Sequence, residues 1–317
     1  MSLDEDSKNL LARRLEIGAP YFQDMTPEGA RTAMAEGRKA ANITPPEMAT
    51  TRYITSGVDG CPMDMRLYIP KGAEAAQGQL SPFMVFFHGG GFVVGDLDTH
   101  DILCRNLSIA SGIPILAVDY RLAPEHKFPA AINDGKVAVN WIAQNAMSLG
   151  LDKDRMAVGG DSAGGNIATM MCHLARDGAV EASFVYQLLA YPWVDMTMAQ
   201  NSYGVSADGL PVTYDAMAWF RDLYLNSDAE QVDWRASPLM APDMKDLPPA
   251  CILTAGFDPL CDEGLAYGRR LEQGGVPVHA LHYPGQIHGF LTLGAQLPTA
   301  GKAIDALGTA LKAGLAV

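Results

Sequence analysis

The 317-residue sequence has no long hydrophobic run, no internal repeat and no low-complexity tract. No stretch approaches the roughly 18 apolar residues that a membrane-spanning helix needs, so we expect no membrane partner. The first residues, MSLDEDSKNLLARRLE, are acidic before they are apolar, which argues against a secretory signal. With 48% apolar and 19% charged residues, the composition is that of an ordinary globular protein.

Positive charge is scarce, with 23 Lys and Arg against 36 Asp and Glu and a net charge of −13. Contacts to nucleic-acid phosphates need clustered Lys and Arg, so we expect no nucleic-acid partner.

Cysteine is also scarce: the five residues are odd in number and form no C-x-x-C pair. This pattern predicts reduced, mostly structural thiols in a cytoplasmic protein. The cysteines are Cys61, Cys104, Cys172, Cys251 and Cys261.

The first ~50 residues predict amphipathic helices, the second starting after Thr26-Pro27-Glu28. From residue 51 the pattern changes to strands. Thr51–Ser56 and Met65–Ile69 indicate an antiparallel pair joined by a Gly/Asp turn. Six more strands follow, separated by spacers that include helices expected at Ala130–Met147 and Ala163–Ala175. These strands are Phe83–Phe87, Pro114–Val118, Met156–Val158, Phe184–Leu189, Ala250–Thr254 and Val278–Tyr283. The alternation predicts an α/β domain with a mostly parallel sheet of about eight strands.

One segment, Asp195–Pro238, interrupts this alternation. It is long, rich in Met, Tyr and Trp, and places Trp219, Phe220 and Tyr224 at helical spacing. A surface helix packed on the core would explain it, and so would a lid that covers a site together with the N-terminal helices. We therefore divide the chain into an N-terminal helical cap segment (1–50), a catalytic domain in two parts (51–194 and 239–317) and a cap insertion (195–238).

The strongest motif is Gly160-Asp161-Ser162-Ala163-Gly164, a G-x-S-x-G pattern between a predicted strand and a predicted helix. This is the context of a nucleophile elbow, in which a sharp turn exposes the serine hydroxyl and leaves room only for glycines nearby. The helix start supplies unpaired N–H groups where an oxyanion would form. A phosphate-binding turn is the alternative, but such a loop usually carries a Lys that contacts the phosphate, and this stretch has none. We therefore predict Ser162 as the nucleophile.

His88-Gly89-Gly90-Gly91-Phe92 follows the strand Phe83–Phe87 and has the form of an HGGG oxyanion loop. Taken alone, three glycines more often mean a flexible turn. Together with the elbow they predict that the N–H groups of Gly90, Gly91 and Ala163 form the oxyanion hole. We interpret His88 as a residue that shapes this loop rather than as a base.

Where a nucleophile elbow carries the serine, the acid follows it along the chain, and the histidine base comes after the acid. His173 lies on the helix after the elbow, and His279 and His282 fall inside a strand. His288 comes directly after the last strand, and we predict it as the general base. The acid should end the preceding strand, which selects Asp258. Asp262 and Glu263 are close, but acidic residues there suit the first turn of the next helix.

These motifs together resemble the hormone-sensitive-lipase family of esterases, the bacterial family IV group. The resemblance covers about residues 50 to 315, and the helical N-terminus is similar to the family's cap. It implies an α/β-hydrolase fold with a helical cap, no cofactor and no metal, and a preference for short acyl esters. The matching segments are HGGGF at 88–92, DYRLAPEHKFPAA at 119–131, GDSAGG at 160–165, DPLCDEG at 258–264 and HGF at 288–290.

The resemblance also implies that Asp119, Tyr120, Arg121 and Glu125 brace the site. We thus expect a carboxylic ester hydrolase for short- to medium-chain acyl esters, acting through Ser162, His288 and Asp258. An amidase or formamidase with the same triad is a second hypothesis, because acyl transfer does not reveal its leaving group. A non-catalytic receptor for a small molecule is a third, which the intact His288 argues against. A homodimer is left open.

Overall fold

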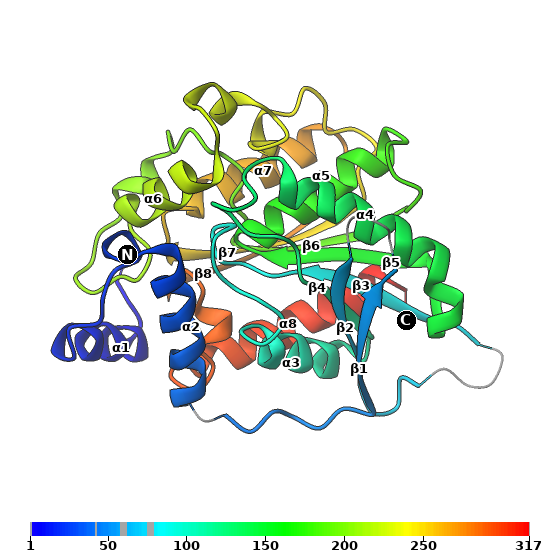
Figure 1. Ribbon diagram of the computed structural model, residues 1–317, viewed down its shortest axis with the longest axis horizontal. Coiled ribbons are helices and arrows are strands. Elements are labelled where there is room, and N and C mark those ends of the chain that lie inside the picture. The colour runs from blue at the N-terminus through cyan, green and yellow to red at the C-terminus, as the bar shows by residue number, and fades with distance from the viewer. Residues whose placement is uncertain (1, 42, 58–61, 75–78, 317) are drawn as a thin grey trace.

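The computed structural model describes residues 2–41, 43–57, 62–74 and 79–316. Eight strands form one sheet in the order β1-β2-β4-β3-β5-β6-β7-β8 (Figure 1). β2 is antiparallel to both of its neighbours, β1 and β4, and the other five pairs are parallel, which confirms the prediction of a mostly parallel sheet. The strands are β1 (Thr50–Ser56), β2 (Met63–Ile69), β3 (Ser81–Phe87), β4 (Ile115–Val118), β5 (Leu151–Asp161), β6 (Tyr186–Ala190), β7 (Ala250–Phe257) and β8 (Val278–Ile287).

Helices cover both faces of this sheet (Figure 1). α3 (Asp101–Ser111) and α8 (Thr299–Gly314) pack together on one face, while α4 (Ala130–Asn145), α5 (Ala163–Arg176) and α7 (Cys261–Gln273) lie on the other. The strands are apolar on both sides for this reason. In β3, Phe83, Val85 and Phe87 belong to one buried core, and Met84 and Phe86 belong to the other.

The carboxyl ends of the central strands meet at one edge of the sheet, where open α/β sheets bind ligands. The register brings this about directly: Phe87 at the end of β3 pairs with Gly160 of β5, and Phe257 at the end of β7 pairs with Ile287 of β8. The segments that follow these strands therefore start side by side. They carry the predicted oxyanion loop, nucleophile, acid and base.

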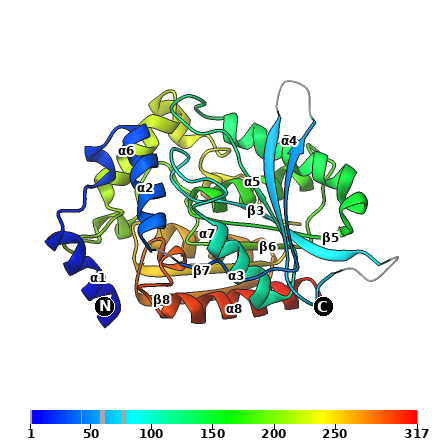
Figure 2. The same ribbon diagram turned by 60° about the horizontal axis from the view of Figure 1, so that its bottom comes forward.

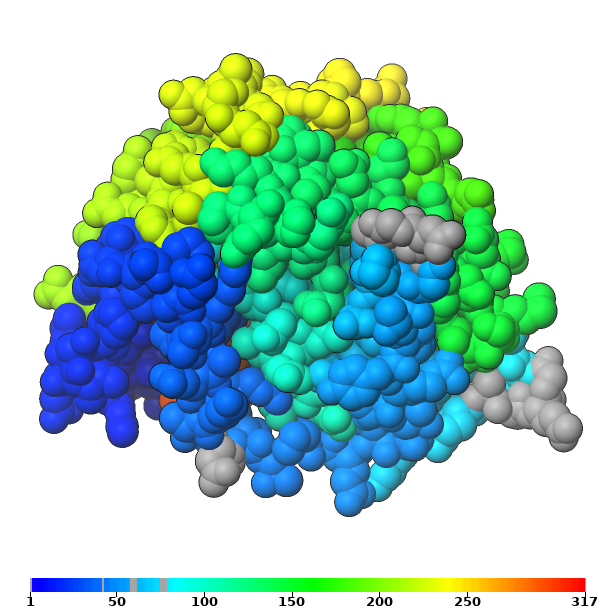
Figure 3. All heavy atoms as spheres, in the orientation of Figure 1, coloured from blue at the N-terminus to red at the C-terminus, as the bar shows by residue number. Residues whose placement is uncertain are grey.

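The N-terminal segment and residues 195–238 lie against each other at one end of the molecule (Figures 2 and 3). The first contains α1 (Glu5–Glu16), η1 (Phe22–Asp24) and α2 (Pro27–Ala41), and the second contains α6 (Tyr214–Tyr224). The Gly29 N–H donates to Thr26 Oγ1 at 3.1 Å, so α2 begins where the sequence predicts it. Residues 195–238 also contain two short 3₁₀ turns, η3 (Asn201–Gly204) and η4 (Asp228–Val232), and a third, η5 (Pro238–Met240), begins at their last residue.

Most predicted strand boundaries differ from the structure by a few residues, and the largest differences are at the start of β5 and the end of β8. β5 starts at Leu151 rather than Met156, because the polar residues Asp152–Arg155 hide its beginning. β8 continues past the predicted end at Tyr283, through Pro284 and Gly285, to Ile287. Proline is tolerated there because β8 is an edge strand of the sheet and because its register with β7 shifts between Ala255 and Phe257. The Gly/Asp turn expected between β1 and β2 falls mostly outside the described residues.

Four cysteines, Cys104, Cys172, Cys251 and Cys261, are buried free thiols, and Cys61 lies outside the described residues. Among the helices that the structure describes, none has the length and apolar character needed to cross a membrane.

Candidate active site

Ser162 lies in a strained turn between β5 and α5. Its φ of 54° and ψ of −118° are unusual for a residue with a side chain, and such strain is common at active sites. A methyl group on Gly160 would collide with the backbone of Gly164 and with the Phe87 carbonyl. A methyl group on Gly164 would collide with the same Phe87 carbonyl. The Ser162 N–H donates to the Ala190 carbonyl at 2.9 Å, which ties the turn to β6. This is the local geometry that the G-x-S-x-G pattern predicts.

The structure brings the three predicted triad residues together. Ser162 Oγ lies 3.0 Å from His288 Nε2, and His288 Nδ1 lies 2.8 Å from Asp258 Oδ2. The second Asp258 oxygen accepts the Leu260 N–H at 2.8 Å, which fixes the carboxylate in its turn. Asp258 is fully buried, and Ser162 and His288 expose 6% and 8% of their surface. With Nδ1 donating to the carboxylate, Nε2 is free to accept the serine proton.

The rejected candidates lie elsewhere. His173 is buried on α5 against Trp234, where burial lowers the pKa of its ring to about 4. His279 and His282 sit in β8, and His282 pairs with Thr254. Asp262 and Glu263 are in the first turn of α7, as expected. Glu263 is fully buried and accepts the Val194 and Asp195 N–H groups, so it holds the chain after β6 in place.

The oxyanion loop follows β3 and turns at its glycines. Gly90 and Gly91 have φ values of 122° and 59°, and a side chain on Gly91 would collide with the Phe220 ring. The Gly90 carbonyl accepts the Val93 and Val94 N–H groups, which closes the turn. The Gly90 and Gly91 N–H groups have no partner among the described residues. Ala163 is the first residue of α5, where helical N–H groups lack an intrahelical acceptor.

His88 shapes this loop, as we interpreted it. It is buried, its ring stacks on Tyr120 with centroids 4.3 Å apart, and its carbonyl accepts the Tyr120 hydroxyl at 2.7 Å. Burial, with nearby His100, lowers the pKa of the His88 ring to about 4. His88 is thus neutral at physiological pH and supplies packing.

The other residues of the 119–131 motif contact the surroundings of the site. Arg121 pairs with Asp134 of α4 at 2.7 Å. Glu125 pairs with Arg31 of α2 at 2.7 Å, and this ion pair lowers the pKa of Glu125 to about 2. Burial, with neighbouring carboxylates, raises the pKa of Asp119 to about 6.

An aromatic pair that no sequence motif predicted lies beside the oxyanion loop. Phe220 of α6 packs on Gly91, and Phe22 of η1 packs on Phe220 with centroids 5.0 Å apart. Phe22 also lines an apolar cavity of about 610 Å³ between the N-terminal segment and α3. Phe220 thus links the oxyanion loop to Phe22, while none of Ser162, His288 and Gly91 lines the cavity itself. The helical spacing around Phe220 predicted a helix, but no local signal predicted its contact with Gly91.

No group of three or more His, Cys, Asp or Glu side chains in the described part of the chain is arranged to hold a metal ion.

Comparisons with known proteins identify the fold family and the class of enzyme. Residues 84–292 match a family model described as the α/β-hydrolase fold. Carboxylic ester hydrolase LipN of Mycobacterium tuberculosis is 44% identical over 72% of this chain and 61% of its own length. Carboxylesterase NlhH of the same organism is 37% identical over 91% of this chain and 90% of its own.

A solved structure covers nearly the whole chain. An ester-hydrolase from the metagenome of Lake Arreo, in complex with a bipyridine phosphonate derivative, aligns with a TM-score of 0.93 at 38% identity over 99% of this chain and 100% of its own. These relatives confirm the predicted class of serine carboxylic ester hydrolase. The chain belongs to the α/β-hydrolase fold family, within which its resemblance to the hormone-sensitive-lipase-like esterases is confirmed.

Proposed function

We propose that this protein hydrolyses short- to medium-chain acyl esters with Ser162 as nucleophile, His288 as general base and Asp258 as the acid that orients it. The observation that carries the proposal is the continuous contact from Asp258 Oδ2 through the His288 ring to Ser162 Oγ, at 2.8 Å and 3.0 Å. A serine hydroxyl is unreactive at its free pKa and needs such a base to become a nucleophile.

The reaction follows from these contacts. His288 Nε2 accepts the Ser162 proton as Oγ attacks the ester carbonyl, and Asp258 stabilises the imidazolium that forms. The Gly90, Gly91 and Ala163 N–H groups stabilise the oxyanion of the tetrahedral intermediate. His288 then returns the proton to the leaving alcohol, which leaves an acyl group on Ser162. Water attacks this acyl-enzyme with the same base, and the acid and free serine are released.

The apolar part of the ester is proposed to enter the cavity of about 610 Å³ past Phe22 and Phe220. Its lining is largely apolar, with side chains such as Met34, Leu103 and Leu293. Since pockets of about 300–1,000 Å³ suit small molecules, this volume fits a short- to medium-chain acyl ester. We propose accordingly that segments 1–50 and 195–238 act together as a cap over the catalytic domain.

An acyl-chain series of p-nitrophenyl esters from acetate to palmitate, measured beside an aryl amide, tests the function. We expect kcat/KM to be highest between acetate and octanoate and to be at least about 100-fold lower for the amide. A higher rate on the amide would identify an amidase instead. A rate that stays flat from about pH 5 to about pH 8 would contradict a histidine base. A protein that hydrolyses neither and whose Ser162 resists an organophosphonate would be a receptor.

We also propose that the protein acts in the cytoplasm. The four buried free thiols support this, because reducing compartments keep cysteines unpaired. Fractionation of the native host's cells with an antibody to this chain would test it, and recovery in an extracytoplasmic fraction would contradict it.

A further inference from the structure

The oxyanion loop rests on the residue that precedes the nucleophile. The Gly89 N–H donates to Asp161 Oδ1 at 2.9 Å, and a methyl group on Gly89 would lie 2.5 Å from Asp161 Oδ2. The carboxylate thus fits closely against the glycine backbone. Because Gly89 is bonded directly to Gly90, the position of Asp161 governs where the Gly90 and Gly91 N–H groups point.

Asp161 is itself held by a residue outside the predicted site. Only 4% of Asp161 is exposed, and His100 Nε2 lies 3.4 Å from its Oδ1. Burial on its own raises the pKa of Asp161, but the His100 ring and the Gly89 N–H outweigh it, and the net pKa is below its ordinary value. A buried carboxylate is costly without such partners. His100 is therefore well placed to keep Asp161 ionised.

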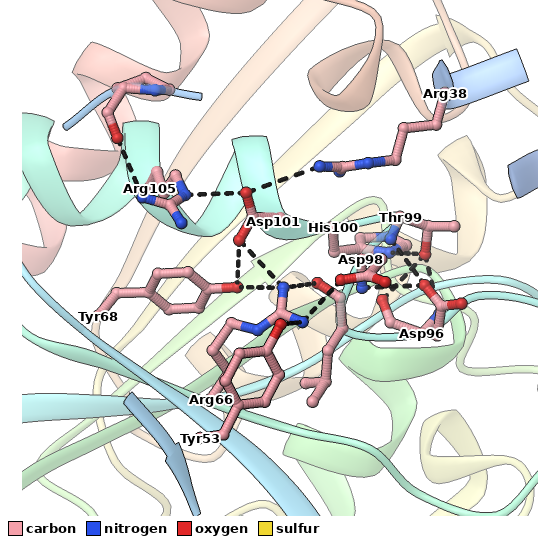
Figure 4. Close-up of polar contacts among 12 residues, drawn as sticks. Arg38, Tyr53, Arg66, Tyr68, Asp96, Asp98, Thr99, His100, Asp101 and Arg105 are labelled. Carbon is pink, nitrogen blue, oxygen red and sulfur yellow. Dashed lines mark hydrogen bonds and ion pairs between the residues drawn. The ribbon is translucent and has the colours of Figure 1, made fainter. Parts of the chain in front are cut away.

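His100 is anchored on its other side. Its Nδ1 lies 3.1 Å from Thr99 Oγ1, and the side chain of Asp96 accepts the Asp98 and Thr99 N–H groups, which makes residues 96–99 a closed turn (Figure 4). The next residue, Asp101, starts α3 and accepts hydrogen bonds from Arg66, Tyr68 and Arg105. The ring of His100 is thus fixed between a braced turn and a braced helix start.

We propose that His100 is a positioning residue for the oxyanion hole, which it serves through Asp161 and the Gly89 N–H. Among the described residues, no hydrogen bond joins His100 to Ser162 or His288. Its effect on the reaction is therefore indirect, through Asp161. The proposal rests on the proposed ester hydrolysis. Loss of His100 should lower the stabilisation of the tetrahedral intermediate while leaving the binding of the ester in its ground state unaltered.

The test compares His100→Leu, His100→Asn and His100→Gln. Leu removes the polar contact, Asn is too short to reach Asp161, and Gln retains a donor of similar reach. We expect kcat on p-nitrophenyl acetate and butyrate to fall about ten-fold for Leu and Asn, less than the 10²–10³-fold typical for removal of an oxyanion donor. KM should stay within about two-fold, and Gln should restore most of kcat.

His173→Leu is the matched control, because His173 is also a buried histidine but its ring has no hydrogen-bond partner among the described residues. It should keep kcat within about two-fold. A double-mutant cycle with Asp161→Asn adds a readout: if His100 acts through the Asp161 charge, His100→Leu should cost less than about two-fold in that background. A full ten-fold loss there, or an unchanged kcat in His100→Leu and His100→Asn, would overturn the proposal.

The rate at which an organophosphonate labels Ser162 separates this proposal from the proposed function. Its tetrahedral adduct places an oxygen where the oxyanion would lie, and no ester turnover is needed. If the wild type turned over no ester, the proposed ester hydrolysis would be contradicted, but the role of His100 would not. If the wild type and His100→Leu were labelled at an equal rate, the role of His100 would be contradicted, but the proposed ester hydrolysis would not.

Discussion

The rim of the sheet, with Ser162, Asp258 and His288, and the proposed cap over it are held in different ways. At the rim, Ser162, Asp258 and His288 follow strand ends whose register is set by backbone hydrogen bonds. The proposed cap contributes no strand to the sheet, and side chains make many of its contacts with the catalytic domain. Arg31 of α2 donates at 2.8 Å to each of the Val93 and Ala123 carbonyls and pairs with Glu125, while Phe22 contacts Phe220.

This difference implies a division of roles. A site fixed by a sheet keeps its atoms within the small tolerance that proton transfer requires. A segment that lies outside the sheet can shift to admit substrates without changing the strand register that fixes that geometry. Substitutions at the rim should therefore change kcat, and substitutions in the cap should change which esters are accepted. The following predictions run from the largest expected effect to the smallest.

The largest effect is expected from Asp258→Asn. Loss of the carboxylate leaves His288 in the wrong tautomer, and kcat should fall about 10⁴-fold. Asp262→Asn is the control, because Asp262 lies four residues away and accepts the Ser202 N–H instead. It should keep kcat within about three-fold. Steady-state kinetics on p-nitrophenyl butyrate measures both, and the reverse order would assign the acid to Asp262.

Gly91→Ala should lower kcat about 100-fold, because the added methyl collides with Phe220 and displaces the oxyanion loop. Gly178→Ala separates this collision from backbone strain. Gly178 has a similar φ of 69°, but nothing lies within 4 Å of the added methyl. It should destabilise the fold by about 1 kcal/mol and leave kcat unchanged. Equal activity in the two variants would contradict the assigned oxyanion loop.

Phe220→Ala should change the acyl-length profile. Removing the ring opens the passage between the cavity and the oxyanion loop, so kcat/KM for octanoate relative to acetate should rise about ten-fold. The cavity left behind should also cost about 3 kcal/mol in unfolding free energy. Tyr214→Ala, which alters an exposed residue on the same helix, should do neither. A profile that does not move would place the acyl chain away from the cavity.

Arg31→Lys should loosen the cap, because an ammonium cannot reproduce the forked contacts of the guanidinium with Glu125 and two carbonyls. We expect KM to rise a few-fold with kcat nearly unchanged, and limited proteolysis to cut faster in α2. Exposed Arg13→Lys should match the wild type in both assays. If kcat fell instead of KM rising, the cap would be part of the catalytic geometry.

The smallest effect is a pH-dependent gain in stability from Asp119→Asn. Burial raises the pKa of Asp119 from 3.8 to about 6, so the folded state holds this proton more tightly than the unfolded state. The carboxylate therefore costs stability progressively as pH rises through that window. Asparagine should gain at most about 1 kcal/mol at pH 7, since the side chain is 39% exposed and solvent screens its charge. Urea unfolding at pH 3 should show no gain.

The same contrast explains what the sequence could predict. Ser162, His288, Asp258 and the glycines were predictable because each motif states a backbone requirement: a strained turn, a strand end or a close approach. The mostly parallel sheet followed from apolar runs alternating with helices. The contact of Phe220 with Gly91 and that of His100 with Asp161 were not predictable, because each joins distant segments through side chains that carry no local signature. The end of β8 was wrong because Pro284 normally signals a loop.

The most direct test of the account is the covalent intermediate itself. Rapid mixing of the protein with p-nitrophenyl butyrate, followed by acid quench and peptide mass analysis, should find one butyryl group on Ser162, formed in a burst and then lost to water. Ser162→Ala should form none while unfolding at the same urea concentration as the wild type. A butyryl group on any other residue, or steady turnover by Ser162→Ala above about a tenth of the wild-type rate, would contradict the triad.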